Sequence, residues 1–161
     1  DLGRHSQYSG QQLDYTDPET KEKYIPWIVE TSGGVDRTFL FLLMDAYIEE
    51  KDRIVLKLHP KIAPYKVAVF PLVKNKPELV AKAQGIYKHL KLNLSIPSVW
   101  DDRGNIGKRY YSQDEIGTPW CVTIDYQTLE DNTVTVRDRD TAIQNRIAIS
   151  QLDSYFTDKL K

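Results

Sequence analysis

KVAVFPLV, residues 66–73, decides the fold. Its apolar residues form a nearly continuous run of strand length, which is typical of a strand whose two sheet faces are both covered by helices. Pro77 follows this run and suits the first turn of a helix. That helix would pack through one apolar stripe formed by Leu79, Ala83, Ile86, Tyr87 and Leu90. A buried strand followed by an amphipathic helix indicates an α/β fold.

Three more strand candidates follow, and together they predict a mixed sheet. LSIPSVWD (94–101) and TPWCVTID (118–125) predict two strands, with the polar and partly helical segment 105–117 between them. LEDNTVTVR (129–137) indicates a turn and another strand. We expect the first strands to be parallel through right-handed crossovers, and segments 118–125 and 133–137 to form an antiparallel hairpin.

The chain closes with a predicted helix. It is expected to start near Asp140 or Thr141, either of which can cap it, and to pack through Ile143, Ile147, Ala148 and Leu152. The expected fold is therefore α/β, with a mixed sheet of about five strands flanked by helices.

The segment before this sheet has its own strand and helix signals. YIPWIV (24–29) has the length of a strand, and Pro26 favours an edge strand or a bulge. From Arg37 the pattern becomes helical, with apolar residues at Phe39, Leu42, Leu43, Ala46 and Tyr47. The sequence thus predicts a strand, a glycine-containing loop and a helix in this part of the chain.

Two prolines mark IVLKLHPKIAPYK (54–66) as a connector between domains. We place a boundary near residue 62, which gives domains 1–61 and 62–161. The length of 161 residues suits one ordinary domain, or a small domain with part of another attached.

Composition and charge exclude several classes of protein. Hydrophobic residues are 40% and charged residues 28% of the chain, as in soluble globular proteins. The formal net charge of -1 argues against a generic polyanion binder and leaves room for a local basic patch. The single cysteine, Cys121, excludes an internal disulfide and a multi-cysteine zinc site, and fits a reducing compartment. No apolar run approaches the roughly 20 residues of a membrane span, and His5, His59 and His89 lack ligand spacing, so we expect a soluble, cytoplasmic protein without a metal site.

ETSGGVDR, residues 30–37, is the first candidate site. Its glycines allow a ligand to approach the backbone closely, and Arg37 supplies a planar, charged fork for a phosphate or carboxylate. Glu30 could accept hydrogen bonds from an ammonium group. The alternative is a solvent-exposed turn before a core helix. The segment is neither a Walker loop nor a dinucleotide fingerprint, because both glycine patterns are absent.

Two further segments combine basic residues with aromatic or acidic ones. GNIGKRYYSQDEIGTPW (104–120) interleaves bases and tyrosines, which suits stacking on unpaired nucleobases. A helix with a solvated charged face is the alternative. TVTVRDRDT (133–141) places Arg137 and Arg139 on one strand face, which suits the reading of base edges or phosphates. Here the alternative is a set of Asp–Arg ion pairs that fixes a corner.

Longer strings resemble a known family. DLGRHSQYSG (1–10), DPETKEKYIPWIVETS (17–32) and GVDR (34–37) resemble the end of the catalytic domain of class II glycyl-tRNA synthetases of the dimeric type. LHPKIAPYKVAVFPLVK, NIGKRYYSQDEIGTPWCVTIDYQTLED and VTVRDRDT resemble that family's C-terminal anticodon-binding domain. Together they cover essentially the whole chain. The resemblance implies an α/β anticodon-binding domain, preceded by the last strand and helix of an antiparallel class II catalytic domain.

The resemblance also implies roles for residues near the first glycine pair. GVDR is similar to the third class II signature, which implies that Gly34 and Arg37 contact ATP. Glu30 and Ser32 stand in two positions that are usually glycine in other class II enzymes. The resemblance implies that Glu30 pairs with the amino group of glycine and that Ser32 forms a hydrogen bond nearby. Side chains in these positions fill the space that a larger substrate would need.

In related anticodon domains the arginine that ends the penultimate strand reads an anticodon base. By position that residue is Arg137. The same resemblance gives further anticodon candidates, namely Arg139, Lys108, Arg109, Asp114 and Glu115.

The resemblance implies an enzyme that uses ATP and Mg²⁺ to activate glycine and transfers it to the 3′ end of tRNA(Gly), as a homodimer. This segment lacks the first two class II signatures, so we expect no catalytic residue or metal ligand in it and no activity from it alone. The alternative is a non-catalytic, synthetase-like accessory protein that binds nucleic acid. Such a protein would be expected to lose Glu30, Ser32 and Arg37, all of which are present.

Overall fold

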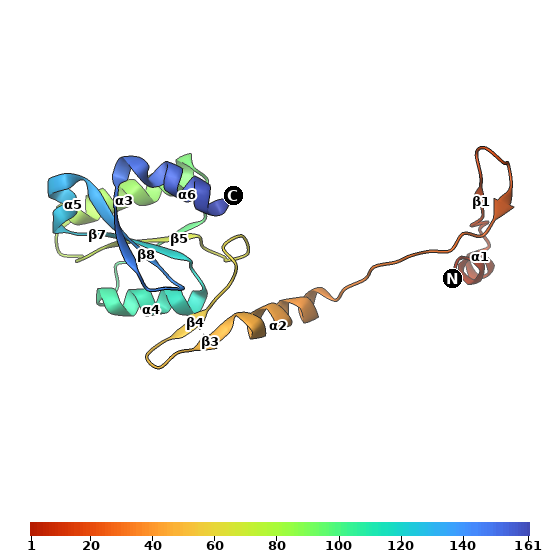
Figure 1. Cartoon of the computed structure of the whole chain (residues 1–161), viewed down its shortest axis with the longest axis horizontal. Coiled ribbons are helices and arrows are strands. Elements are labelled where there is room, and N and C mark those ends of the chain that lie inside the picture. The colour runs from red at the N-terminus through yellow and green to blue at the C-terminus, as the bar shows by residue number, and fades with distance from the viewer. The chain divides into compact units, whose positions relative to one another are not determined.

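The computed structural model describes all 161 residues and divides into two compact units, Asp1–Arg37 and Thr38–Lys161. Figure 1 labels the elements along the chain. They are α1 (Leu2–Ser9), β1 (Tyr15–Thr16), β2 (Lys23–Tyr24), α2 (Val35–Ala46), β3 (Tyr47–Glu49), β4 (Ile54–Leu56), β5 (Val67–Pro71), α3 (Pro77–Lys88), the π-helix η1 (His89–Asn93), β6 (Ser98–Trp100), α4 (Ile106–Ile116), β7 (Trp120–Ile124), α5 (Tyr126–Asp131), β8 (Thr133–Asp138), β9 (Gln144–Ala148), the 3₁₀ helix η2 (Ile149–Gln151) and α6 (Leu152–Leu160).

A five-stranded sheet organises the second unit. Its strand order is β6-β5-β7-β8-β9, with β5 parallel to both β6 and β7. β7 pairs antiparallel with β8, and β8 with β9. The predicted mixed α/β sheet and its parallel first strands are confirmed, as is the antiparallel pairing of the strands predicted in 118–125 and 133–137.

Helices cover the two faces of this sheet unequally. α3 and α6 lie on one face, where the main core forms around Val67, Val122 and Phe156 (Figure 1). α4 lies on the other face, over a smaller cluster of Ala68, Phe70 and Cys121. Since side chains alternate along each strand, KVAVFPLV supplies buried residues to both cores, which explains its continuous apolar character.

The helix predicted to start near Asp140 or Thr141 is wrong, because residues 144–148 form the edge strand β9. The Asp138 carboxylate accepts hydrogen bonds from the backbone of Asp140 and Thr141, and this turn folds the chain back onto β8. The four-residue spacing of Ile143 and Ile147 fitted a helix, but pairing with the open edge of β8 prevails. The helix α6 starts only at Leu152.

A short helix stands where a turn was expected between β7 and β8. Asp125 caps α5 in a capping box: its carboxylate accepts from the Thr128 amide, and the Thr128 hydroxyl accepts from the Asp125 amide. The helix ends at Asn132, whose φ of 54° is left-handed. The expected direct hairpin is therefore an antiparallel pair joined by one helical turn and a half.

The charged stretch after α2 forms a hairpin. β3 pairs antiparallel with β4, so that Tyr47 faces Leu56 and Glu49 faces Ile54. The hairpin belongs to the second compact unit, which begins at Thr38 rather than near residue 62. The domain boundary near residue 62 stays a prediction, since compactness alone does not define where one domain's sequence ends.

The strand predicted over residues 24–29 is wrong beyond its first residue. Only Lys23 and Tyr24 pair, with Thr16 and Tyr15. Trp27 and Val29 are each 99% exposed. A strand needs a partner for its backbone groups, and this unit offers none beyond the two residues of β1.

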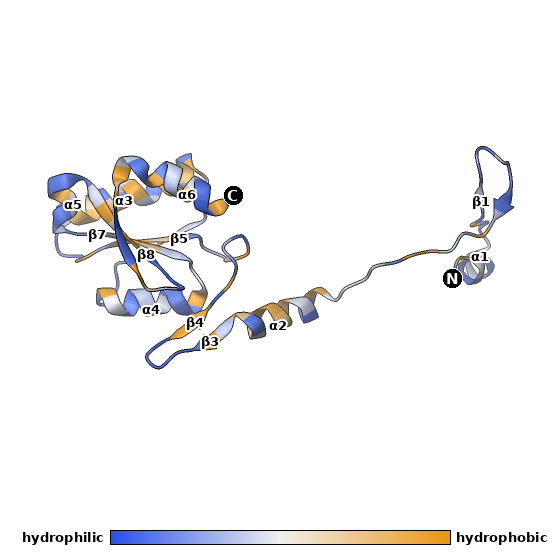
Figure 2. Cartoon of the chain, in the orientation of Figure 1, coloured by the Kyte–Doolittle hydropathy of each residue, from blue (hydrophilic) through white to orange (hydrophobic).

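α2 is rich in apolar residues, as its orange segments in Figure 2 show. Phe39, Phe41 and Met44 are each more than half exposed, while Ala46 at the end of the helix is buried. The expected helix after the glycine loop is confirmed, and most of its apolar side chains lie open within this chain. No helix of the structure combines the length and the apolarity that crossing a membrane requires.

Substitution of Gly117 tests whether the β3–β4 hairpin lies in close contact with the end of α4. Its φ is +87°, and a Cβ atom there would lie 2.8 Å from the Leu56 carbonyl oxygen. Gly104 also has a positive φ but has open space around it. We expect Gly117→Ala to lower the free energy of unfolding by about 3 kcal/mol and Gly104→Ala by about 1 kcal/mol, since only the first adds a clash to backbone strain. Urea unfolding measures both, and equal losses would contradict the close approach.

Candidate nucleic-acid interface

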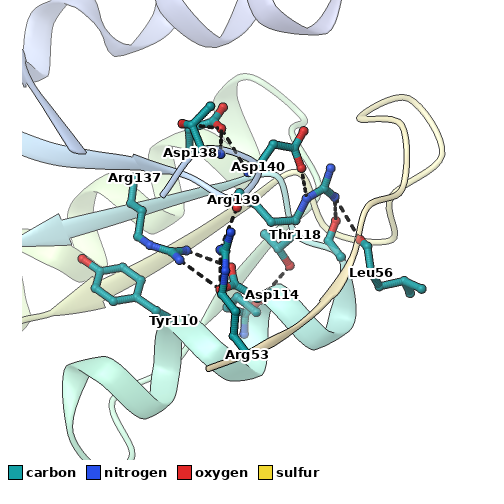
Figure 3. A network of polar contacts seen from close by, with 12 residues as sticks. Arg53, Leu56, Tyr110, Asp114, Thr118, Arg137, Asp138, Arg139 and Asp140 are labelled. Carbon is teal, nitrogen blue, oxygen red and sulfur yellow. Dashed lines mark hydrogen bonds and ion pairs between the residues drawn. The ribbon is translucent and has the colours of Figure 1, made fainter. Parts of the chain in front are cut away.

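Asp114 is the centre of a buried ion-pair network. The carboxylate is fully buried in the last turn of α4 and accepts two parallel hydrogen bonds from Arg137, at 2.8 Å and 2.9 Å. Arg53, from the β3–β4 loop, donates to the same carboxylate at 3.1 Å. Figure 3 shows the two guanidinium groups converging on it from different elements. A bidentate arginine–carboxylate pair of this kind is both strong and directional.

Tyr110 extends this network toward the sheet. The Arg137 guanidinium lies over the Tyr110 ring, 5.0 Å from its centroid, in a cation–π arrangement. The Tyr110 hydroxyl shares a 2.6 Å hydrogen bond with Thr123 of β7. Burial raises the pKa of the Tyr110 hydroxyl above 10.0, so it stays protonated. Arg137 is therefore held on one side by a carboxylate and on another by an aromatic ring.

Arg139 is 1% exposed and holds backbone groups together. It donates to the carbonyl oxygens of Gly117 at 2.7 Å, Leu58 at 2.9 Å and Leu56 at 3.2 Å. Its Nε atom also pairs with the Asp140 carboxylate at 2.8 Å. Every side of the guanidinium thus has a protein partner.

Arg109 is buried in a similar way at the other end of α4. It donates to the carbonyl oxygens of Arg103, Gly104 and Pro71. Its guanidinium lies 6.0 Å from the centroid of the Phe70 ring. The residue joins the end of β5 to the loop before α4, which accounts for a charged side chain in the interior.

Four of the six predicted anticodon residues, Asp114, Arg137, Arg139 and Arg109, are buried and paired within the chain. For TVTVRDRDT the geometry favours the second hypothesis, ion pairs that fix a corner, although Arg137 pairs with α4 rather than with its own strand. The other two, Lys108 and Glu115, are exposed on α4. Contact of any of the six with RNA stays a prediction.

The α4 face of β8 and β9 is open and polar. Val134 and Val136 point into the core under α3 and α6, so Thr133 and Thr135 point to the opposite face. Arg146 of β9 lies beside them and donates to both threonine hydroxyls, at 2.9 Å and 3.2 Å. We call the surface of Thr133, Thr135, Arg146 and Gln144 the open sheet face.

Arg146 is the charged group of the open sheet face, and sequence reasoning missed it. Its side chain is 30% exposed and pairs through two nitrogen atoms with the Asp125 carboxylate, at 2.5 Å and 3.0 Å. Partial burial opposes ionisation of Asp125, but hydrogen bonds from Arg146 and Thr128 outweigh it and lower the pKa below 3.8. Gln144 and Arg146 are two residues apart, which in a strand places them on one face. This spacing could have pointed to Arg146, but the segment was predicted to be a helix.

The predicted glycine and ATP residues lie in the first unit. Glu30, Ser32 and Gly34 belong to a stretch without helix or strand, and Arg37 lies in the first turn of α2. All four are exposed, and no side-chain hydrogen bond within the chain joins them. The structure leaves these groups free for a ligand and does not by itself assemble them into a pocket.

The mixed α/β sheet, with helices on both faces and a partly open polar area, has the fold of a domain found in class II aminoacyl-tRNA synthetases. A prolyl-tRNA synthetase from Cryptosporidium parvum, solved with halofuginone and AMPPNP, superposes with a TM-score of 0.60 at 25% identity, over 65% of this chain and 22% of that one. Residues 66–159 match the family profile described as "Anticodon binding domain", and the chain belongs to that family.

Sequence relatives extend the similarity beyond this domain. A glycine–tRNA ligase from Caldanaerobacter subterraneus subsp. tengcongensis is 52% identical over the whole chain, and one from Borreliella afzelii is 54% identical over 96% of it. The chain spans 35% and 36% of the lengths of these two relatives. The similarity therefore covers both compact units of this chain and about a third of each relative.

The Asp125–Arg146 pair gives a pH-dependent test. Because the pKa of Asp125 is lowered on folding, its ionised form stabilises the fold above about pH 4, and this contribution is lost as the pH falls through the folded-state pKa. We expect Asp125→Asn to lower the free energy of unfolding at about pH 7 and to have a smaller effect at about pH 3. Asp158→Asn, at an exposed pair with Lys161, is the control. Equal effects of Asp125→Asn at both pH values in urea unfolding would contradict the assignment.

Proposed function

We propose that this chain acts as part of a glycine–tRNA ligase, which activates glycine with ATP and transfers it to the 3′ end of tRNA(Gly). The observation that carries the proposal is identity of 52% over 100% of the chain, through the first unit as well as the anticodon-binding domain. A lone RNA-binding module would need to match only residues 66–159. The proposal includes a cytoplasmic, homodimeric enzyme, as the resemblance of the sequence implies.

In this proposal the first unit contributes to the amino acid and ATP site. Glu30 accepts hydrogen bonds from the ammonium group of glycine, and Ser32 forms a hydrogen bond nearby. Gly34 lets ATP approach the backbone, and the Arg37 guanidinium binds its phosphates. Larger amino acids are excluded sterically, and no smaller amino acid exists that such a pocket would have to reject.

Mg²⁺ would accompany ATP in the proposed enzyme. No group of three His, Cys, Asp or Glu side chains lies in position to hold a metal ion. We assign Mg²⁺ to the ATP that the whole enzyme would use. The contribution of this chain is to position glycine, ATP and tRNA.

The exposed apolar side chains of α2 support a place within a larger domain. Phe39, Phe41 and Met44 are uncovered in this chain. A helix that is apolar on most of its sides is normally buried by other parts of a protein. The proposal assigns its cover to the rest of the synthetase catalytic domain.

For the anticodon we propose two layers of residues. The open sheet face, together with exposed Lys108 and Glu115, contacts the RNA. The buried residues Asp114, Arg137, Arg139 and Arg109 hold the backbone that presents this surface. Arginine, glutamine and threonine side chains at fixed positions offer hydrogen bonds to base edges and a flat guanidinium for stacking.

Replacement of Glu30 tests the glycine site in the full-length enzyme. We expect Glu30→Gln to raise the KM for glycine roughly tenfold or more in glycine-dependent ATP–pyrophosphate exchange, because a hydrogen bond to a charged group is worth about 1.5–3 kcal/mol. Glu22→Gln, at another exposed position of the first unit, should leave the KM unchanged. An unchanged KM in Glu30→Gln would remove Glu30 from the site.

Replacement of Arg146 tests the open sheet face. We expect Arg146→Ala to lower kcat/KM for tRNA in aminoacylation roughly tenfold, since one stacking contact is worth about 1–3 kcal/mol. Glycine-dependent ATP–pyrophosphate exchange should be unchanged, because that reaction needs no tRNA. Lys88→Ala removes a positive charge on α3, which covers the other face, and is the matched control. Equal losses in both reactions would place Arg146 away from the RNA.

A further inference from the structure

Arg53 is a charged residue outside the anticodon-binding family profile that reaches its interior. It lies in the β3–β4 loop, 61 residues before Asp114 in the sequence. Its Nη1 atom donates to the Asp114 carboxylate at 3.1 Å and to the Arg139 carbonyl oxygen at 2.8 Å. Its Nε and Nη2 atoms pair with Glu50 of the same loop. Arg53 therefore stabilises the loop through Glu50. It also joins the loop to α4 and to Arg139, the residue after β8.

A second set of bonds holds the outgoing side of the same hairpin. Arg139 donates to the carbonyl oxygens of Leu56, at the end of β4, and of Leu58. The third carbonyl that it binds belongs to Gly117, at the end of α4. Gly117 lacks the Cβ atom that would strike Leu56, so the two backbones lie close together. We call the contacts of Arg53 and Arg139 with these groups the hairpin clamp.

Apolar packing at this junction is local, and Val55 of β4 is buried with 2% of its surface exposed. Leu58, Ala46 and Ala63 form a small cluster of their own with Leu56 packed against it, separate from the two clusters on the faces of the sheet. Beside this local packing, oriented polar bonds join the hairpin to α4 and to the residue after β8. Such bonds form in one geometry only, so they fix an orientation more narrowly than apolar contact does.

The geometry points to a positioning role for the hairpin clamp. We propose that it fixes the end of α2 on the anticodon-binding domain, so that tRNA bound to this domain is held in register with the helix that begins at the proposed ATP residues. α2 runs directly into β3, and the Lys57 amide donates to the Ala46 carbonyl at the end of α2. Arg53 is then a positioning residue that touches neither RNA nor glycine. This inference rests on the proposed function.

A distance measurement tests the structural half of the proposal in the 161-residue chain. Spin labels are placed on cysteines introduced at Glu49 in β3 and Glu130 in α5, both exposed. Native Cys121 stays unlabelled, because burial holds its thiol away from the reagent and raises its pKa. We expect a narrow distance distribution that Arg53→Met broadens and that Lys51→Met, which removes a charge from the same loop, leaves narrow. Equally narrow distributions in both variants would overturn the clamp.

Kinetics of the full-length enzyme test the functional half. We expect Arg53→Met to lower kcat/KM for tRNA in aminoacylation roughly tenfold, within the range of measured couplings between sites, and to leave glycine-dependent ATP–pyrophosphate exchange unchanged. Arg53→Lys, which keeps the charge, should restore part of the loss, and Lys51→Met should match the unmodified enzyme. Equal activity of Arg53→Met and Lys51→Met, or parallel loss in both reactions, would overturn the positioning role.

The distance measurement and the kinetics together distinguish failure of this proposal from failure of the proposed function. An unmodified enzyme that attaches no glycine to tRNA would refute the proposed function, whereas the distance distributions would still decide whether the hairpin is clamped. An active enzyme whose Arg53→Met variant charges tRNA normally would leave the proposed function standing and refute the positioning role.

Discussion

The buried carboxylate of Asp114 is the constraint around which the second compact unit is arranged. A fully buried charge is costly unless its hydrogen-bonding capacity is filled by charged partners. Arg137 and Arg53 fill it here, one from β8 and one from the β3–β4 loop. Because these partners belong to segments far apart in sequence, the carboxylate can be satisfied only when α4, β8 and the hairpin are all in place.

The arginines of the chain serve two different purposes according to their burial. Arg109, Arg137 and Arg139 are held inside and bind carbonyl oxygens or a carboxylate. A guanidinium suits this use because it carries five donors in a planar fork and its charge is permanent. Arg146 is held by Asp125 at the surface instead, where part of the side chain stays accessible. Arginine therefore stabilises the interior of the domain at three positions and provides an accessible charged group on its open sheet face at a fourth.

Elements that depend on local sequence patterns were mostly predicted correctly, whereas two features that depend on contacts between distant parts of the sequence were not. KVAVFPLV and the stripe after Pro77 are local patterns, and both β5 and α3 were predicted from them. Residues 144–148 form a strand only because β8 offers an open edge, which no local pattern shows. The burial of Arg137 was equally hidden, since its partner lies 23 residues away on α4 and the family resemblance implied only a role toward the anticodon.

The charge balance of the chain indicates how the open sheet face would recognise RNA. The charge of Arg146 is paired with Asp125, so the open sheet face, as defined by its four residues, carries no free cation. Attraction of phosphates by many free cations gives affinity without sequence preference and makes it steeply dependent on salt. Paired and oriented donors act differently, because they bind only groups that meet their geometry. A face built in this way favours selection among bases over general affinity for RNA, as the reading of an anticodon requires.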